Sequence, residues 1–420
     1  MKKRLMIVII LAIIAVAAGA FAYCSRQAVQ QAGTRELPGA SYVRQVITAN
    51  SKDSRTIMWQ CDTALENPMV EYRLAGAEEI RQVAARSEKY TDDGQNAVLY
   101  TARLENLPAA GARLEYRLVG NGKTGIWHSL KTDAGDGFTA LIFPDSQSSD
   151  YSDWRELVQD AARRNIEAEF FINMGDLVDN GEDHSQWEAW LDAIYGIADR
   201  IPVAPLMGNH ETYNRDWKVR EPVAYLAEFA VPDNGSSHYG RYYYSYDYGP
   251  VHFIVLNTQQ DELRDFAPDL LAEELAWFRQ DVAAARQPWK VVLMHKDVLQ
   301  YRIEDRPERT EGLSEDGKIW MPLFEEAGID AVLSAHFHTY RNRGHIMDYQ
   351  HNPAGPLYIL TGVAGNARYP NLWLDHALDE YVAPQPETDN YLVMKAAADK
   401  IDIFCYLPDG TELDHAVLQK

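Results

Sequence analysis

Cysteine is scarce in this chain, with three among 420 residues. Cys24, Cys61 and Cys405 cannot build a disulfide framework, because at least one of them must stay unpaired. No CxxC motif occurs, which argues against a zinc site made of thiolates. Cys61 follows Ile57 and Trp59 at every second position. We therefore expect its side chain to be buried among apolar residues.

Basic residues are also in short supply. The chain has 40 lysines and arginines against 62 aspartates and glutamates, which gives a net charge of −22. Such a surface repels phosphate backbones, so we expect no nucleic acid to bind through a broad basic face. A small phosphorylated substrate stays compatible with this charge, because bound metal ions can invert the local field.

Long apolar runs are few, and the clearest is at the N-terminus. Lys2, Lys3 and Arg4 precede an uncharged run over 5–22, which is near the lower limit for spanning a bilayer. This run ends in Ala-Phe-Ala, the small-x-small pattern of a cleavage site. Residues 1–22 are therefore a cleaved signal peptide or an uncleaved signal anchor. The basic flank predicts export in both cases, to a periplasmic, extracellular or membrane-anchored location that touches lipid only through this segment.

The next part of the chain has the pattern of short strands. Residues 23–36 are small and polar, which is typical of a linker. Between 37 and 134, apolar and polar residues alternate in several short runs separated by turn residues, namely 57–61, 70–74 and 114–118. Alternation of period two over about a hundred residues predicts a β-sandwich.

The pattern of apolar and polar residues changes at residue 137. From there to residue 420 it predicts an α/β region. Four apolar runs have the composition of strands buried on both faces: 141–143, 170–172, 291–294 and 331–333. Helices are expected between them. Leu271, Leu275, Phe278 and Val282 form the apolar stripe of one amphipathic helix, and 154–164 has a similar pattern.

Each of these four predicted strands, and a fifth apolar stretch that ends at Leu206, is followed by polar residues. These are Asp145 with Gln147, Asp176, Asn209 with His210, His295, and His336 with His338. Alone, each is also explained as a turn residue, a helix cap or a buried histidine. Ligands bind beyond the carboxyl ends of the strands in open α/β sheets, so we expect these side chains to converge. Asp, Asn and neutral His suit iron, manganese or zinc.

These clusters, in this order, resemble the calcineurin-like metallophosphoesterase superfamily, and within it the purple-acid-phosphatase-like branch. Three further stretches match that branch: 242–253, 288–290 and Thr361-Gly362 with Gly365. The resemblance covers residues 40–420. It implies an α+β, two-domain fold, in which a fibronectin-type-III-like β-sandwich (37–134) precedes a four-layer α/β/β/α metallophosphoesterase domain (137–420).

The resemblance also implies roles for the polar residues. It assigns six ligands to two divalent or trivalent metal ions: Asp145, Asp176 and His338 for the first, and the shared Asp176 with Asn209, His295 and His336 for the second. A hydroxide between the metals would attack phosphorus. His210 would be the catalytic residue that protonates the leaving oxygen.

The chain departs from the family pattern at three places. Gln147 stands where many members have a ligand histidine, and Asp179 where purple acid phosphatases have a ligand tyrosine. The stretch 308–312 lacks the second histidine of plant enzymes. The colour of purple acid phosphatases comes from tyrosinate bound to ferric iron, so we expect this chain not to be purple.

The predicted function is hydrolysis of phosphate monoesters by an exported, acid-phosphatase-like enzyme. Phosphodiester hydrolysis at the same metal site is the nearest alternative, and a surface binding protein with a vestigial hydrolase domain is another. Tyr340, Arg341 and Arg343 follow the last cluster. They are predicted either to reach the substrate phosphate or to pair with surface carboxylates.

Overall fold

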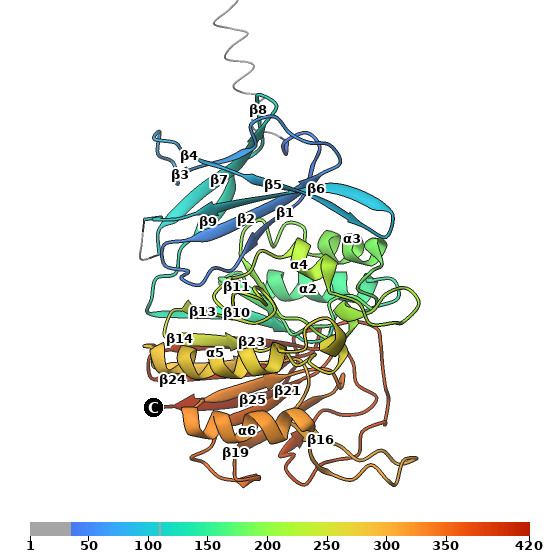
Figure 1. The fold of residues 1–420 in the computed structure, drawn as a ribbon. Helices are drawn as coiled ribbons and strands as arrows, with labels where there is room; N and C mark the ends of the chain where they lie inside the picture. Colours follow the sequence, from blue (N-terminus) through green and yellow to red (C-terminus); the bar gives the residue numbers. More distant parts are fainter. Residues whose placement is uncertain (1–34, 109–110) are drawn as a thin grey trace, which may run out of the picture.

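The computed structural model describes residues 35–108 and 111–420, which form a mixed α/β fold rich in sheet and with few helices (Figure 1). No helix within these two ranges is both long and apolar enough to cross a bilayer. The predicted signal peptide or anchor (1–22) and most of the predicted linker (23–36), with Cys24, lie outside them. Cys61 and Cys405 are buried and unpaired, as expected for Cys61.

Nine strands lie within residues 40–131, gathered at one end of the molecule (Figure 1). They are β1 (Ala40–Val46), β2 (Arg55–Cys61), β3 (Met69–Leu74), β4 (Arg81–Ala84), β5 (Arg86–Asp92), β6 (Gln95–Leu104), β7 (Arg113–Gly120), β8 (Lys123–Thr124) and β9 (His128–Lys131). β1, β2, β6 and β5 pair in that order. β3, β4, β7, β8 and β9 form a second, five-stranded sheet. Between the two sheets, the rings of Trp59 and Tyr100 stack with centroids 5.1 Å apart.

The predicted alternation is clear in β7, where Leu114, Tyr116 and Leu118 are buried and the residues between them are less so. In β2 it takes another form, because all seven residues are buried. Ile57 faces the local apolar core. Met58 joins the larger core of the α/β region, and its sulfur accepts a hydrogen bond from the backbone N–H of Ala230 at 3.1 Å. Both faces of this strand are therefore covered.

One sheet runs through most of the chain. β1 pairs in parallel with β12 (Val203–Pro205), with Val46 opposite Val203. The resulting ten-stranded sheet has the order β25-β24-β23-β10-β11-β12-β1-β2-β6-β5. Its remaining strands are β10 (Gly137–Phe143), β11 (Phe170–Asn173), β23 (Tyr391–Ala397), β24 (Lys400–Tyr406) and β25 (Glu412–Gln419). The neighbours β10, β11 and β12 are parallel.

A second large sheet has eight strands. Its elements are β13 (Tyr244–Tyr248), β14 (Val251–Val255), β15 (Trp289–Leu293), β18 (Ala331–Ser334), β19 (Tyr340–Met347), β20 (Gln350–His351), β21 (Leu357–Thr361) and β22 (Tyr381–Val382). β14, β15, β18 and β21 are parallel neighbours. A separate ribbon pairs β16 (Leu299–Gln300) with β17 (Gly312–Leu313). The strands β11 and β18 are buried along their whole length, as predicted from their apolar runs.

The two large sheets face each other through aromatic side chains. The ring centroids of Phe138 in β10 and Phe170 in β11 lie 5.9 and 5.8 Å from the ring centroid of Phe253 in β14. The ring of Tyr248 in β13 lies 4.4 Å from that of Phe170. The aromatic run over 242–248 thus serves mainly as hairpin packing.

Helices cover the outer sides of this pair of sheets. α2 (Ser152–Arg164) and α3 (His184–Ala193) contact one another and the ten-stranded sheet, where the ring of Trp154 lies 5.2 Å from that of Phe143. α5 (Leu270–Ala284) contacts the eight-stranded sheet, since its Asp281 accepts a hydrogen bond from Ser245 of β13. α6 (Glu315–Ala327) packs beside α5 (Figure 1). The short helices are α4 (Val223–Glu228), η1 (His210–Thr212) and η2 (Glu262–Asp265).

The buried face of α5 is wider than the predicted stripe. Leu270, Glu274, Trp277 and Phe278 are buried, whereas Leu271, Leu275 and Val282 are only partly covered. Leu271, Leu275 and Val282 still pack against the core. Glu274 also points inward, where it accepts a hydrogen bond from the backbone N–H of Asn257 at 2.7 Å. A fully buried carboxylate in a helix is not foreseen by apolar periodicity.

Candidate metal centre

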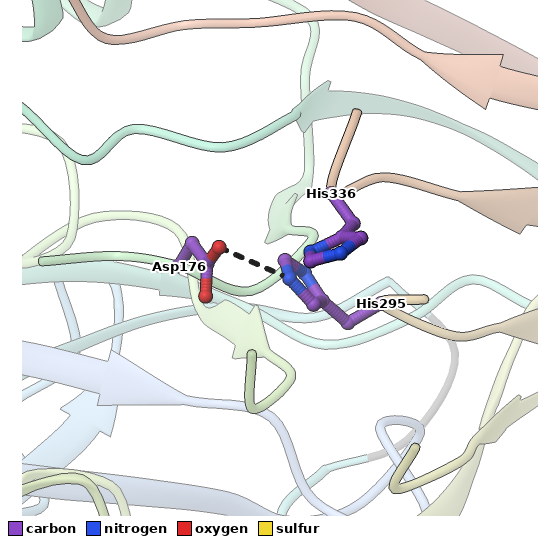
Figure 2. Close-up of side chains that lie close together, drawn as sticks. All are labelled: Asp176, His295 and His336. Carbon is purple, nitrogen blue, oxygen red and sulfur yellow. Dashed lines mark ion pairs between the residues drawn. The ribbon is translucent and has the colours of Figure 1, made fainter. Parts of the chain in front are cut away.

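Six of the predicted site residues meet at the carboxyl ends of parallel strands from both large sheets. Asp145 follows β10, Asp176 follows β11, Asn209 follows β12, His295 follows β15, and His336 and His338 follow β18. Two groups have donor atoms that all lie within 4.8 Å of one another: Asp176, His295 and His336, and Asp145, Asp176 and His338. Figure 2 shows the first group. Asp176 belongs to both.

Asp176 lies at a sharp turn made possible by glycine. Its own φ is 47°, and that of Gly175 is 91°, both in the left-handed region where glycine is favoured. A Cβ atom on Gly175 would lie 2.6 Å from the ring nitrogen Nδ1 of His295, and one on Gly208 would collide with the Asp176 carboxylate. Gly175 and Gly208 are therefore needed for the close approach of Asp176 to His295 and to the loop after β12.

The rings of His295 and His338 are oriented by backbone carbonyl groups. Nδ1 of His295 donates to Met174 O at 2.9 Å, and Nδ1 of His338 donates to Ala367 O at 2.8 Å. A carbonyl oxygen only accepts, so Nε2 of each neutral ring carries the free lone pair. Nε2 of His295 lies 3.1 Å from Asp176 Oδ2 and 3.2 Å from Asn209 Oδ1. Nε2 of His338 lies 3.5 Å from Asp145 Oδ1.

His336 is held differently, through its backbone. Its N–H donates to both carboxylate oxygens of Asp145, at 3.1 and 3.0 Å. Its φ of 77° turns the chain so that the ring lies 5.1 Å from that of His295. Nδ1 of His336 is buried without a hydrogen-bond partner among the described residues, as is Oε1 of Gln147. Buried polar atoms without partners are rare, and a metal ion is one explanation for them.

Burial and opposite charges together perturb the ionisation of this cluster. Although burial alone lowers it, the carboxylates of Asp176 and Asp145 raise the pKa of His295 to about 9. The pKa of Asp176 is lowered, because the imidazoles of His295 and His210 outweigh the opposing effect of burial. Burial, with His295 nearby, lowers the pKa of His336 well below its usual value. Buried charges of this kind require partners or metal coordination.

The donor set fits a pair of metal ions. Two carboxylates, one amide and three imidazoles offer oxygen and nitrogen atoms, and the described part of the cluster contains no thiolate. This combination suits iron, manganese or zinc. Gln147 is buried two positions after Asp145 in the chain, which is compatible with its predicted place as a weak ligand.

His210 lies beside the two groups and belongs to neither. It begins η1, and its backbone N–H donates to Asp176 Oδ1 at 2.9 Å. Its Nδ1 lies 2.6 Å from the carbonyl oxygen of Asp179, and its side chain is 15% exposed. His210 is thus adjacent to the shared carboxylate of Asp176 and partly open to solvent.

Glu211 organises the site, although the sequence alone assigned it no role. Its buried carboxylate accepts hydrogen bonds from four backbone N–H groups: Asp176, Leu177, Val178 and Gly208. Burial, with the charge of Asp176 nearby, raises the pKa of Glu211 to about 7. The carboxylate thereby ties the loop after β11 to the loop after β12. In the sequence, the only indication of this role is that Glu211 directly follows the predicted site residues Asn209 and His210.

The residues after His338 point away from the centre. Arg343 is fully buried and pairs with Asp297 at 2.6 Å. Arg341 lies 2.5 Å from Asp379, and the hydroxyl of Tyr340 donates to Asp414 at 2.8 Å. These residues therefore pair with carboxylates, as one of the two predictions had it, but Asp297 and Asp379 are buried and not at the surface.

A residue farther along the chain approaches the centre in place of Tyr340. The ring of Tyr369 lies 4.9 Å from that of His338, and 44% of this residue is exposed. Together with His338 and Arg368 it borders a hollow of about 230 Å³.

Comparisons with known proteins agree with this architecture. A family model described as calcineurin-like phosphoesterase matches residues 128–340. Purple acid phosphatase 15 of Arabidopsis thaliana is 28% identical over 212 residues, which are 48% of this chain and 36% of that protein. Human acid phosphatase type 7 is 26% identical over 241 residues, which are 50% of this chain and 52% of that protein. The matched parts thus span well under two thirds of these relatives.

A solved structure shares the fold over nearly the whole chain. A purple acid phosphatase from yellow lupin (Lupinus luteus) seeds superimposes with a TM-score of 0.77 at 17% sequence identity, covering 91% of this chain and 74% of that one. Just over half of the present chain is matched by the family model. The chain therefore belongs to the calcineurin-like phosphoesterase family.

Proposed function

We propose that this chain hydrolyses phosphate monoesters with two metal ions held by the six side chains at the strand ends. The observation that carries the proposal is the shared position of Asp176, which belongs to both groups of potential ligands. A carboxylate common to two sites is what a two-metal hydrolase requires. The acid phosphatases among the relatives support the same reaction.

In this proposal Asp145, Asp176 and His338 hold one ion, and Asp176, Asn209, His295 and His336 hold the other. When bound, the ions supply positive charge beside the phosphate oxygens and lower the pKa of a water molecule toward neutrality. Asp145 and Asp176 supply the negative charge that balances the ions. Met174 and Ala367 keep Nε2 of His295 and His338 directed at the centre.

His210 is the proton donor of the proposed reaction. Its Nδ1 donates a hydrogen bond to the carbonyl oxygen of Asp179. Nε2 is therefore the nitrogen that releases a proton to the substrate. The ring is close to Asp176 through its own backbone N–H, yet it stays partly open to solvent. Nε2 would deliver a proton to the leaving oxygen as the phosphorus–oxygen bond breaks, which prevents the departure of a strongly basic alkoxide.

We also propose the finer features of architecture and location. Residues 37–134 would be a fibronectin-type-III-like sandwich, supported by two sheets around a local core. Residues 137–420 would be the four-layer catalytic domain, supported by α2 and α3 against one sheet and α5 against the other. Export of the protein is proposed from the basic and apolar N-terminal segment.

Metal analysis of the purified protein tests the proposal most directly. We expect two metal equivalents, hydrolysis of nitrophenyl phosphate that chelation removes and metal restores, and slower hydrolysis of bis-nitrophenyl phosphate. Faster turnover of the diester would instead assign the site to phosphodiesters. Metal-independent hydrolysis, or none with both ions bound, would overturn the proposal.

A variant of the shared carboxylate sharpens this test. Asp176→Asn should lose activity and at least one metal, because a neutral amide cannot balance two cations. Asp402→Asn is a suitable control, since Asp402 lies on β24 and pairs with Lys400 at 2.9 Å. Two metals and full activity in Asp176→Asn would contradict the two-metal assignment.

A further inference from the structure

An exposed tryptophan lies beside the proposed proton donor. Trp217 is 57% exposed, and its ring centroid lies 5.9 Å from that of His210 and 6.1 Å from that of Tyr213. Single exposed aromatic residues are common on protein surfaces and need no explanation. Tyr195 and Phe266 are exposed as well, but neither ring contacts another aromatic ring in the described ranges. Trp217 differs from them because it borders the catalytic histidine.

Several hydrogen bonds join residues within the loop that carries Trp217. Oδ1 of Asn214 accepts hydrogen bonds from the backbone N–H groups of Asp216 and Lys218, at 3.0 and 2.8 Å. The backbone of Asn214 bonds to Trp217 and Lys218 at 2.8 and 2.9 Å. At the tip, Arg215 pairs with Asp93 at 2.8 Å. The backbone of Trp217 is thus held in place by a network of hydrogen bonds within the loop.

The backbone at Trp217 is in the left-handed region, with φ at 59°. A bulky residue is unfavourable there, and glycine or asparagine is the usual occupant. The loop therefore holds a large apolar ring in solvent in a conformation that the residue itself disfavours. Such outliers are found where a side chain serves a site.

The interplanar angle between Trp217 and His210 is 86°. The two rings are therefore nearly perpendicular and do not stack on each other. A proton donor must lie within hydrogen-bond reach of the leaving oxygen. Trp217, whose ring centroid lies 5.9 Å from that of His210, is close enough to contact a group attached to an oxygen held at His210.

We infer that Trp217 binds the leaving group of the substrate, and that the preferred substrates are phosphate esters whose leaving group carries a flat aromatic ring. Phenols and nucleosides share this chemistry, because each offers a π-face to the indole. The inference rests on the proposed function, since it places the leaving oxygen at His210. It makes Trp217 a specificity-determining residue and gives it no part in the chemical step.

The test compares Trp217→Gly, which suits the left-handed backbone, with Trp217→Phe, which keeps a ring. Tyr195→Ala is the control, because Tyr195 is the most exposed tyrosine of the described residues. Values of kcat/KM are measured for phenyl phosphate, a nucleoside 5′-monophosphate and ethyl phosphate. We expect Trp217→Gly to lower kcat/KM for phenyl phosphate and for the nucleotide by about 10-fold, the usual effect of one lost stacking contact. The kcat/KM for ethyl phosphate should stay unchanged. Trp217→Phe and Tyr195→Ala should keep the wild-type selectivity.

A loss confined to phenyl phosphate would assign the position to phenols, and one confined to the nucleotide would assign it to nucleosides. Equal losses on all three esters would overturn the inference, since Trp217 would then only support the loop or His210. Unchanged selectivity in Trp217→Gly would overturn it as well.

A binding measurement separates this inference from the proposed function. Calorimetry with phenylphosphonate and methylphosphonate requires no turnover. Wild-type protein should bind phenylphosphonate more tightly, and Trp217→Gly should bind both equally. If no ester is hydrolysed, the proposed function fails while this comparison still decides the role of Trp217. Equal affinity of the wild-type protein for both phosphonates would refute that role.

Discussion

The imidazole of His210 is oriented by the backbone of Asp179, whose carbonyl oxygen accepts a hydrogen bond from Nδ1 at 2.6 Å. The carboxylate of Asp179 is farther from the same nitrogen, at 3.7 Å. Asp179 stands where purple acid phosphatases have a ligand tyrosine. The orientation of His210 therefore depends on the path of the loop and not on the side chain of Asp179.

The first prediction concerns this histidine. His210→Ala should keep both metals and lower turnover by about 10²–10⁴-fold, the usual contribution of a general acid. The loss should be larger for ethyl phosphate than for nitrophenyl phosphate, because nitrophenolate leaves without a proton. Asp179→Asn preserves the carbonyl group and should keep most of the activity. Metal loss in His210→Ala would make His210 a ligand instead.

The second prediction concerns Glu211, which accepts four backbone hydrogen bonds through two oxygens. In Glu211→Gln an NH₂ group replaces one oxygen, so two buried N–H donors lose their acceptor. Each unsatisfied group costs about 1–3 kcal/mol, and urea unfolding should show a loss of this order. Metal content should fall as well, because the loops carrying Asp176 and Asn209 would separate. Wild-type stability in this variant would show that the carboxylate is dispensable.

The third prediction is a pH dependence of stability at His128 in β9. Its ring nitrogens lie 3.0 Å from Asp199 and 2.6 Å from Glu36. Although burial alone lowers it, these carboxylates raise the pKa of His128 to about 9, from an ordinary 6.5. A raised pKa in the folded state favours the protonated form. The resulting stability is fully present below pH 6.5 and is lost as the pH rises through 9.

His128→Gln measures this contribution. The shift corresponds to about 3 kcal/mol, so the variant should be less stable than wild type by about that amount at pH 6 and by little at pH 10. Urea unfolding at both pH values gives the two differences. His415→Gln is the matched control, since His415 pairs with Asp402 at 2.8 Å but is a third exposed. A difference that is the same at both pH values would mean that packing, and not charge, accounts for the effect.

The fourth prediction concerns colour. Asp179 and Gln147 cannot supply a phenolate, and the hydroxyl of Tyr340 is bound to Asp414. We expect the ferric protein to lack the intense tyrosinate band in its visible spectrum. Tyr369 is the one tyrosine of the described residues whose ring contacts a predicted ligand ring, that of His338. If a band appears and Tyr369→Phe removes it while Tyr195→Phe does not, Tyr369 is a ligand and the assignment must change.

The sequence alone determined the local features of this protein. Apolar runs predicted strands such as β11 and β18, because a strand buried on both faces needs apolar residues at every position. Polar residues directly after those runs predicted that Asp176 and His336 would meet, because ligands bind beyond the carboxyl ends of the strands in α/β sheets. That β11 and β18 belong to two different sheets became known only from the fold. The alternation in β7 was equally readable. All of these signals lie within a few neighbouring residues.

Tertiary structure alone decided the features that depend on distant partners. The pairing of Val46 with Val203 joins strands more than 150 positions apart, and no local pattern encodes it. Glu274 faces inward because Asn257 offers it a backbone N–H, and Arg343 is buried because Asp297 neutralises it. Buried polar and charged groups are stable only with a partner. Their place therefore became known only when the folded chain brought that partner beside them.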